Sequence, residues 1–272
     1  MIERFARFPA YLAERSRSLL LDGEIPALLA HPDWEKPAPV VLWLHGRTVN
    51  KELDPGRYLR WIRAGIAACA VDLPGHGERA DHGMQQPARS LDVLSAALPE
   101  IDRIVAALRA AGSGVFDTAR MGIGGMSLGG MITLRRLCDP HLFACASVES
   151  TTGNLAALYH PDAERRWPVS HPAERIQPLD PIQNLERWRP IPVLWLHSES
   201  DTVVPIAGMR QFDAALRAHY ASAGASQDMV QALTWPATGA ALEHSGFGRV
   251  SNDAKNAQTE FFVRHLSGAD PR

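Results

Sequence analysis

The chain has 272 residues, a length that single α/β domains commonly reach. Hydrophobic residues make up 46% of it and charged residues 21%, which is typical of a folded globular protein and excludes a disordered or fibrous chain. The formal net charge of −2 gives no electrostatic reason to expect nucleic acid or an anionic membrane as a partner.

Two further features narrow the class of protein. No apolar run approaches the roughly 20 residues that cross a bilayer, and residues 1–7 lack the pattern of a secretory signal, so we expect no membrane span and a cytoplasmic location. The three cysteines stand in apolar stretches without the spacing of a metal or redox pair. We therefore expect buried thiols, no metal and no cofactor.

Short β-rich runs alternate with longer helix-compatible segments, which predicts a mainly parallel sheet with crossover helices. Residues 18–21 and 25–30, joined by Asp22-Gly23, predict an opening antiparallel hairpin. The strands expected after it lie at 40–44, 67–71, 121–125, 143–148, 191–196 and 230–235. The expected helices lie at 58–64, 91–111, 128–138, 206–220 and 252–266.

The alternation pauses between about residues 150 and 189. Five prolines in this stretch exclude one long regular element, because proline lacks an amide donor and cannot continue a helix or a central strand. The pattern predicts one α/β domain over residues 1–272, with a doubly wound, mainly parallel sheet and a small lid insertion at about 152–185.

The strongest local signal is Gly125-Met126-Ser127-Leu128-Gly129, which stands between an expected strand and an expected helix. A Gly-x-Ser-x-Gly motif arises by chance in roughly one chain of this length in ten. Its position between a strand and a helix is therefore stronger evidence for a nucleophile than the motif itself. A serine on a strand-to-helix turn is held in a strained conformation that needs small neighbours, and the helix N-terminus faces developing negative charge. These features favour Ser127 as a nucleophile, the alternative being a glycine-rich turn with an incidental serine.

A serine hydroxyl needs a base and an acid that orients the base. Asp201 follows the expected strand at 191–196, in the loop before a helix, and is the predicted acid. It could instead cap that loop, with Glu149 or Glu199 as the acid. His244 lies in a short loop between the last strand and the closing helix, and is the predicted base.

An oxyanion hole requires two backbone N–H groups, one from the residue after the nucleophile and one from the loop after an early strand. Leu128 supplies the first. Gly46 lets the backbone turn tightly after the strand at 40–44, which makes the amide of Arg47 the predicted second donor. The alternative is that His45-Gly46 simply ends a strand.

Taken together, these residues resemble the α/β-hydrolase superfamily, and specifically its dienelactone-hydrolase-like and prolyl-oligopeptidase-like serine esterases. The resemblance spans nearly the whole chain and rests on Leu44-His45-Gly46, residues 72–79, the Gly-x-Ser-x-Gly, and residues 192–205. Ser198 stands where the family usually has glycine, and Glu243 where it often has glycine before the catalytic histidine. Dienelactone hydrolases proper use cysteine as nucleophile, so their substrate is not carried over.

The expected reaction is hydrolysis of a small-molecule carboxylic ester through an acyl-enzyme. Tyr159, Trp167 and Trp188 are expected to form walls of the substrate pocket, or alternatively to anchor the insertion to the core. Two other functions stay open: an amidase or aminopeptidase-like hydrolase with the same triad, and a non-catalytic binding protein that retains the fold. The sequence predicts neither the oligomeric state nor the physiological ester.

Overall fold

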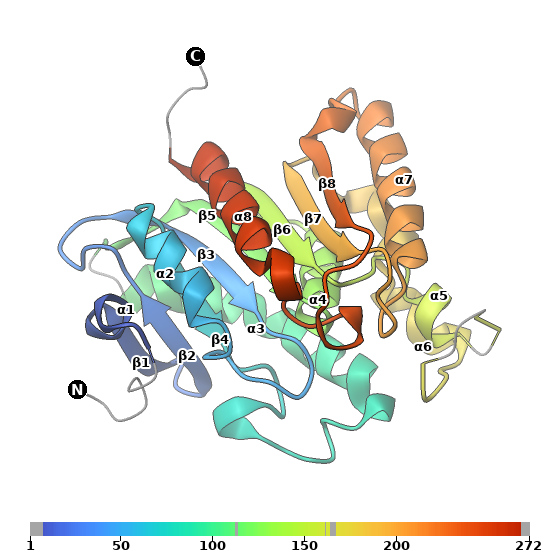
Figure 1. The fold of residues 1–272 in the computed structure, drawn as a ribbon, viewed down its shortest axis with the longest axis horizontal. Helices are drawn as coiled ribbons and strands as arrows, with labels where there is room; N and C mark the ends of the chain where they lie inside the picture. The colour runs from blue at the N-terminus through green and yellow to red at the C-terminus, as the bar shows by residue number, and fades with distance from the viewer. Residues whose placement is uncertain (1–7, 112–113, 161, 164–166, 268–272) are drawn as a thin grey trace.

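A computed structural model describes residues 8–111, 114–160, 162–163 and 167–267. These residues form one eight-stranded sheet in the order β1-β2-β4-β3-β5-β6-β7-β8, flanked by helices (Figure 1). β2 pairs antiparallel with β1 and β4, and every other neighbouring pair is parallel. The predicted mainly parallel, doubly wound α/β sheet is therefore confirmed. The strands are β1 (Ser16–Leu21), β2 (Ile25–Ala30), β3 (Ala38–Leu44), β4 (Ala67–Val71), β5 (Phe116–Met126), β6 (Cys145–Glu149), β7 (Val193–Ser198) and β8 (Val230–Trp235).

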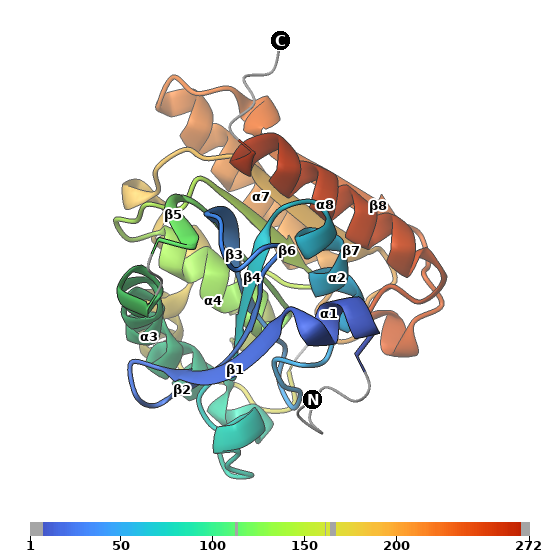
Figure 2. The ribbon, with the colours of Figure 1, turned by 90° about the vertical axis from the view of Figure 1, so that its left-hand side faces the viewer.

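The helices cover both faces of the sheet, as Figure 2 shows with α3 and α4 on one side and α1, α2 and α8 on the other. None of the described helices is long and apolar enough to cross a membrane. The α-helices are α1 (Ala10–Glu14), α2 (Pro55–Arg63), α3 (Ser90–Ala111), α4 (Leu128–Leu137), α5 (Ala156–Tyr159), α6 (Ala173–Ile176), α7 (Ile206–Ser222) and α8 (Ser251–Leu266).

Each face of the sheet has its own hydrophobic core. Successive side chains of a strand point to opposite faces, so Leu42 of β3 belongs to the core that α3, α4 and α7 cover, whereas its neighbour Trp43 belongs to the core that α1, α2 and α8 cover. Because both faces are covered, all seven residues of β3 are buried. This explains why the central strands read as continuous apolar runs in the sequence.

The opening hairpin was predicted from the local sequence pattern, whereas the start of β5 was not. Asp22 and Gly23, with φ of 48° and 76°, are the central residues of the turn expected between β1 and β2, and the amide of Glu24 closes it by donating to the carbonyl of Leu21 at 3.2 Å. β5 begins five residues before the predicted strand, because the ladder between β3 and β5 shifts register between Pro39 and Val40. Of the five added residues, Asp117, Thr118 and Arg120 are polar, and the five follow no strand alternation, which hid them from the sequence pattern.

The proline-rich stretch after β6 folds into the short helices α5 and α6 and several single 3₁₀ turns. Asp180, fully buried, holds the start of α5 by accepting hydrogen bonds from the amides of Leu155 (2.8 Å) and Ala156 (3.2 Å). The indole N–H of Trp167 donates to the carbonyl of Pro87 at 3.2 Å, which ties this stretch to the segment before α3.

Candidate active site

Ser127 follows the last residue of β5 and precedes α4, at the edge of the sheet where the parallel strands end. Its φ of 53° and ψ of −117° form a conformation that non-glycine residues rarely adopt. Hydrogen bonds hold the turn: the amide of Ser127 donates to the carbonyl of Glu149 at 2.9 Å, and its carbonyl accepts from the Thr151 hydroxyl at 2.7 Å. The backbone is thus fixed on both sides of the serine.

The two glycines of the motif are required by close backbone contacts. A Cβ on Gly129 would lie 2.1 Å from the carbonyl oxygen of Leu44, and one on Gly125 would lie 2.5 Å from the carbonyl carbon of Gly129. Neither neighbour can give way, because each is backbone of β3 or α4. The motif therefore brings the start of α4 against the loop that follows β3.

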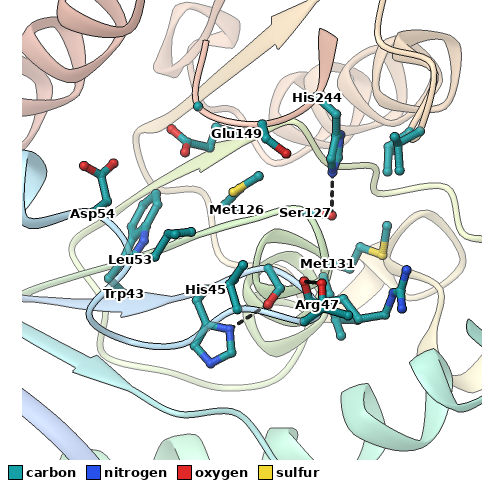
Figure 3. A pocket seen from close by; sticks show the side chains of 18 of the residues that line it. Trp43, His45, Arg47, Leu53, Asp54, Met126, Ser127, Met131, Glu149 and His244 are labelled. Carbon is teal, nitrogen blue, oxygen red and sulfur yellow. Dashed lines mark hydrogen bonds between the residues drawn. The ribbon is translucent and has the colours of Figure 1, made fainter. Parts of the chain in front are cut away.

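The structure brings Ser127, His244 and Asp201 together. Nε2 of His244 lies 3.0 Å from Oγ of Ser127 (Figure 3). Nδ1 of His244 lies 2.7 Å from Oδ2 of Asp201. Because a carboxylate only accepts, Nδ1 carries the proton and Nε2 accepts the serine hydroxyl. The three residues come from the ends of β5, β7 and β8, and all are less than 10% exposed.

Asp201 is held as a carboxylate. Its Oδ1 accepts hydrogen bonds from the amides of Val203 and Val204, both at 2.8 Å, and Nε2 of the buried His197 lies 3.3 Å from its Oδ2. Burial alone would raise the pKa of Asp201, but hydrogen bonds from His197 and His244 outweigh burial and hold the pKa below its ordinary value.

The two alternative acids are engaged elsewhere. The Glu149 carboxylate accepts from Arg57 at 2.8 Å and from Gln258 at 3.1 Å. Glu199 accepts from Arg210 at 2.9 Å on the surface. Of the three acids weighed from the sequence, Asp201 is the one in contact with His244.

The loop after β3 lies beside Ser127, because a Cβ on Gly46 would be 3.5 Å from the Cβ of Ser127. Nδ1 of His45 donates to the carbonyl of Gly46 at 2.6 Å, while its Nε2 accepts from the amide of Leu73. In a planar trans peptide the next N–H, that of Arg47, points away from this carbonyl. Within the described residues, the amides of Arg47 and Leu128 donate to no backbone or side-chain acceptor.

His45 is neutral under ordinary conditions. Burial lowers its pKa to about 4, so the ring keeps one donor and one acceptor nitrogen. The neutral ring satisfies the Gly46 carbonyl and the Leu73 amide at once, which fixes the orientation of the peptide between Gly46 and Arg47.

A cavity of about 450 Å³ opens over Ser127. Tyr159 and Trp167 line it, and their rings meet edge to face with centroids 5.8 Å apart. Trp188 is not one of the lining residues: it packs against Phe212 of α7 and its indole N–H donates to the Tyr220 hydroxyl at 3.0 Å. Trp188 thus anchors the stretch before β7 to the core, the alternative considered from the sequence.

Comparison with known proteins gives the family. The sequence profile of the prolyl oligopeptidase family matches residues 60–269. The chain belongs to the prolyl oligopeptidase family. The resemblance predicted from the motifs is confirmed, and the chain is a hydrolase of this esterase-containing family.

One curated relative and two solved structures show what this chain is similar to. The chain is 25% identical over 259 residues to the esterase YjfP of Escherichia coli, covering 90% of this chain and 96% of that one. The structure resembles TT1662 of Thermus thermophilus with a TM-score of 0.69 and 22% identity, covering 92% and 98% of the two chains. It also resembles the acylaminoacyl peptidase of Pyrococcus horikoshii, with a TM-score of 0.71 and 20% identity, covering 94% of this chain and 42% of that one. Both structural likenesses show the α/β-hydrolase fold.

The two departures from the family pattern meet in space. Ser198, at the end of β7, donates its hydroxyl to Oε2 of Glu243 at 2.7 Å. Glu243 also accepts from the amide and hydroxyl of Thr238, at 2.6 and 2.8 Å, and from the amide of Gly239 at 2.7 Å. We call this set the Glu243 latch; it joins the loop that carries His244 to the end of the neighbouring strand.

Neither the Glu243 latch nor His197 was predicted from the sequence as part of the site. One feature of the sequence indicates the latch, since Ser198 and Glu243 both stand where the family commonly has glycine. His197 stands four residues before Asp201 at the end of an apolar strand, but nothing in the sequence shows its contact with the carboxylate. In the part of the chain that the structure describes, no group of histidine, cysteine, aspartate and glutamate residues is arranged to hold a metal ion.

Proposed function

We propose that this protein hydrolyses carboxylic esters through an acyl-enzyme, with Ser127 as nucleophile, His244 as general base and Asp201 as the acid that orients it. The observation that carries the proposal is the continuous contact from the Ser127 hydroxyl through the His244 ring to the Asp201 carboxylate. Family membership and the esterase relative support serine hydrolase activity.

In this mechanism Oγ of Ser127 attacks the ester carbonyl carbon while its proton passes to Nε2 of His244. The carbonyl oxygen becomes an oxyanion that the amides of Leu128 and Arg47 stabilise, helped by the N-terminus of α4. His244 then protonates the departing alcohol, and a water molecule activated by His244 releases the acid from Ser127.

The proposal includes the insertion at 152–185 as a lid over the substrate. Tyr159 and Trp167 support this part, because both line the cavity beside Leu128 and Met131. Large aromatic rings offer apolar contact to a bound group at a small loss of side-chain entropy. We propose that these residues enclose the apolar part of the ester.

Labelling and substitution test the nucleophile. Ser127→Ala should lose at least about a thousandfold in kcat for p-nitrophenyl acetate, and a fluorophosphonate should label the wild type but not this variant. Ser147→Ala is a matched control, because Ser147 is also buried and its hydroxyl has no partner in the described residues. Full esterase activity in Ser127→Ala would refute the mechanism.

A second measurement separates ester from amide hydrolysis. The same triad cleaves amides when it can protonate a poorer leaving group, so matched p-nitrophenyl esters and p-nitroanilides should be compared. We expect kcat/KM to be higher for the ester. Faster cleavage of the anilide would assign the protein to amide bonds. Absence of fluorophosphonate labelling together with no turnover of either substrate would favour a binding protein.

A further inference from the structure

The cavity over Ser127 has two chemically different sides. On one side Leu128, Met131, Tyr159 and Trp167 supply apolar surface, and the Arg47 guanidinium lies 5.5 Å from the Trp167 ring. The other side carries four charged residues together with Trp43, Leu53 and Met126. In Figure 3 the carboxylates of Asp54 and Glu149 lie on the opposite side of Ser127 from Met131.

The four charged residues form a connected row. Nζ of Lys255 lies 3.0 Å from Oδ1 of Asp54, whose Oδ2 lies 3.2 Å from Nη2 of Arg57. The same Nη2 donates to both carboxylate oxygens of Glu149, at 2.8 and 3.0 Å. We call these residues the charged row; it alternates in sign and carries two positive and two negative groups.

The charged row runs from partly exposed to buried and ends next to the nucleophile. The side chains of Asp54 and Lys255 are 22% and 17% exposed, whereas those of Arg57 and Glu149 are 3% exposed. The four residues of the row and Ser127 line the same cavity. A group bound along the row can therefore belong to an ester held at Ser127.

Stability does not explain why the charged row is there. Removing ionic groups from water costs about as much as their mutual attraction returns, and apolar side chains of similar volume often serve as well. Two buried nitrogens of Arg57, Nε and Nη1, also have no hydrogen-bond partner in the described residues, and the guanidinium lies 4.1 Å from the Trp43 ring. Buried charges that line a substrate cavity point to recognition.

The balance of charge indicates what is recognised. With two acids and two bases the charged row favours neither an anion nor a cation as a whole, but it offers donors and acceptors side by side. Asp54 is the one described partner of the Lys255 ammonium, which leaves that group N–H donors for a ligand. A hydroxyl can accept from Lys255 and donate to Asp54 at the same time.

We propose that the charged row is a subsite for a neutral hydroxylated group, so that the substrate is an amphipathic ester with an apolar part on the Tyr159 side. The inference rests on the proposed function and names the substrate class for it. The hydroxylated part can belong to the alcohol or to the acid, and the experiment distinguishes the two.

Two pairs of esters that differ by a hydroxyl in place of a methyl test the subsite. The pair 3-hydroxypropyl butyrate and butyl butyrate probes the alcohol side, and ethyl 6-hydroxyhexanoate and ethyl heptanoate probe the acyl side. Lys255→Met should lower kcat/KM about tenfold for the hydroxylated member of one pair, the value of one hydrogen bond to a charged group. Its methyl counterpart should change by less than about twofold.

Controls keep the outcomes distinct. Lys255→Arg should retain the preference because it retains the charge, and Lys36→Met, which replaces an exposed lysine paired with Asp33, should change nothing. If Lys255→Met alters both members of each pair equally, or neither, the subsite is refuted while ester hydrolysis stands. If Ser127 takes no fluorophosphonate label and no ester is cleaved, the proposed function itself fails.

Discussion

At the scale of single residues, the conformation of the His244 loop needs an explanation. Leu242, Glu243 and Phe247 all have positive φ, between 54° and 59°, a region that costs a non-glycine residue about 1–3 kcal/mol. Such strain persists only where the surroundings hold it. The Glu243 latch supplies four hydrogen bonds, and the amide of Thr202 donates to the carbonyl of Leu242 at 3.1 Å.

The Glu243 latch stays intact across the range in which the enzyme would work. Hydrogen bonds from the Thr238 amide, the Ser198 hydroxyl and the Thr238 hydroxyl lower the pKa of Glu243 to about 2. A carboxyl group with a depressed folded pKa stabilises the fold above its ordinary value near 4.5, and this contribution is lost as the pH falls toward 2. The latch therefore does not titrate in the pH range in which His244 is proposed to act as a base.

Glu243→Gln should lower kcat about tenfold with little change in KM, because an amide cannot accept from four donors and His244 would leave its position beside Ser127. Steady-state kinetics with p-nitrophenyl acetate measure both constants. Glu260→Gln, an exposed change on α8, is the control.

A double-mutant cycle tests whether the latch acts as one unit. Ser198→Ala should reduce kcat in the wild type but add little in the Glu243→Gln background, because the hydroxyl would already have lost its acceptor. Additive losses from the two changes would show that Ser198 and Glu243 act separately.

A site residue could be predicted from the sequence where its place relative to a neighbouring strand was enough to locate it. Ser127, Asp201 and His244 could be singled out because each follows a predicted strand, and parallel strands end at one edge of the sheet. The contact between Ser198 and Glu243 joins residues 45 positions apart and depends on how far two loops extend. Chain order and residue type do not hold that information.

At the scale of elements, most strands could be predicted, because burial on both faces of the sheet gives continuous apolar runs. Most helices could be predicted as the longer segments between those runs. The strand β8 begins and ends at the predicted residues, and α3 begins one residue before the predicted start. The insertion could be recognised only by its prolines, since its turns are held by single tertiary contacts such as those of Asp180. For the same reason the sequence could not tell that Trp188 packs under α7.

The junction of β5 and α4 gives a prediction at this scale. Gly129→Ala places a Cβ against the carbonyls of Leu44 and His45, so α4 must move away from the loop that carries Arg47. We expect the free energy of unfolding in urea to fall by about 1–3 kcal/mol, with a loss of esterase activity.

Gly56→Ala is the matched control for that change. It lies inside α2, where a Cβ would meet its nearest neighbour at an ordinary 3.5 Å, and should stabilise the protein by about 0.5 kcal/mol through helix propensity. Equal effects of the two substitutions would contradict the view that Gly129 is required by the approach of α4 to β3.

At the scale of the whole molecule, buried histidines make the fold sensitive to acid. Burial lowers the pKa of six histidines below 6.5, and to about 4 for His45 and His141. The six are His31, His45, His76, His141, His171 and His265.

These shifts fix the sign of the pH dependence. Between about pH 6.5 and 4 the unfolded chain binds protons that the folded protein excludes, so stability rises with pH across this window and is lost on acidification. Asp180, whose pKa burial raises to about 6, binds a proton in the folded protein in the same window and offsets one histidine. The free energy of unfolding, measured by urea titration at several pH values from 7 to 4, should therefore fall, and its slope gives the net number of protons taken up on unfolding.

His141→Leu tests this explanation away from the active site. Both ring nitrogens of His141 are buried without a hydrogen-bond partner in the described residues, and the ring lies near Phe143, outside the cavity over Ser127. The wild type loses stability between pH 6.5 and 4, and His141→Leu should lose about 2 kcal/mol less. This value is the shift of the His141 pKa at about 1.4 kcal/mol per unit, reduced because water screens the partly exposed ring. His82→Leu, the same change at an exposed site, should leave the slope as it is. An unchanged slope in His141→Leu would mean that acid sensitivity comes from other groups, because a leucine cannot take up the proton that the unfolded histidine binds.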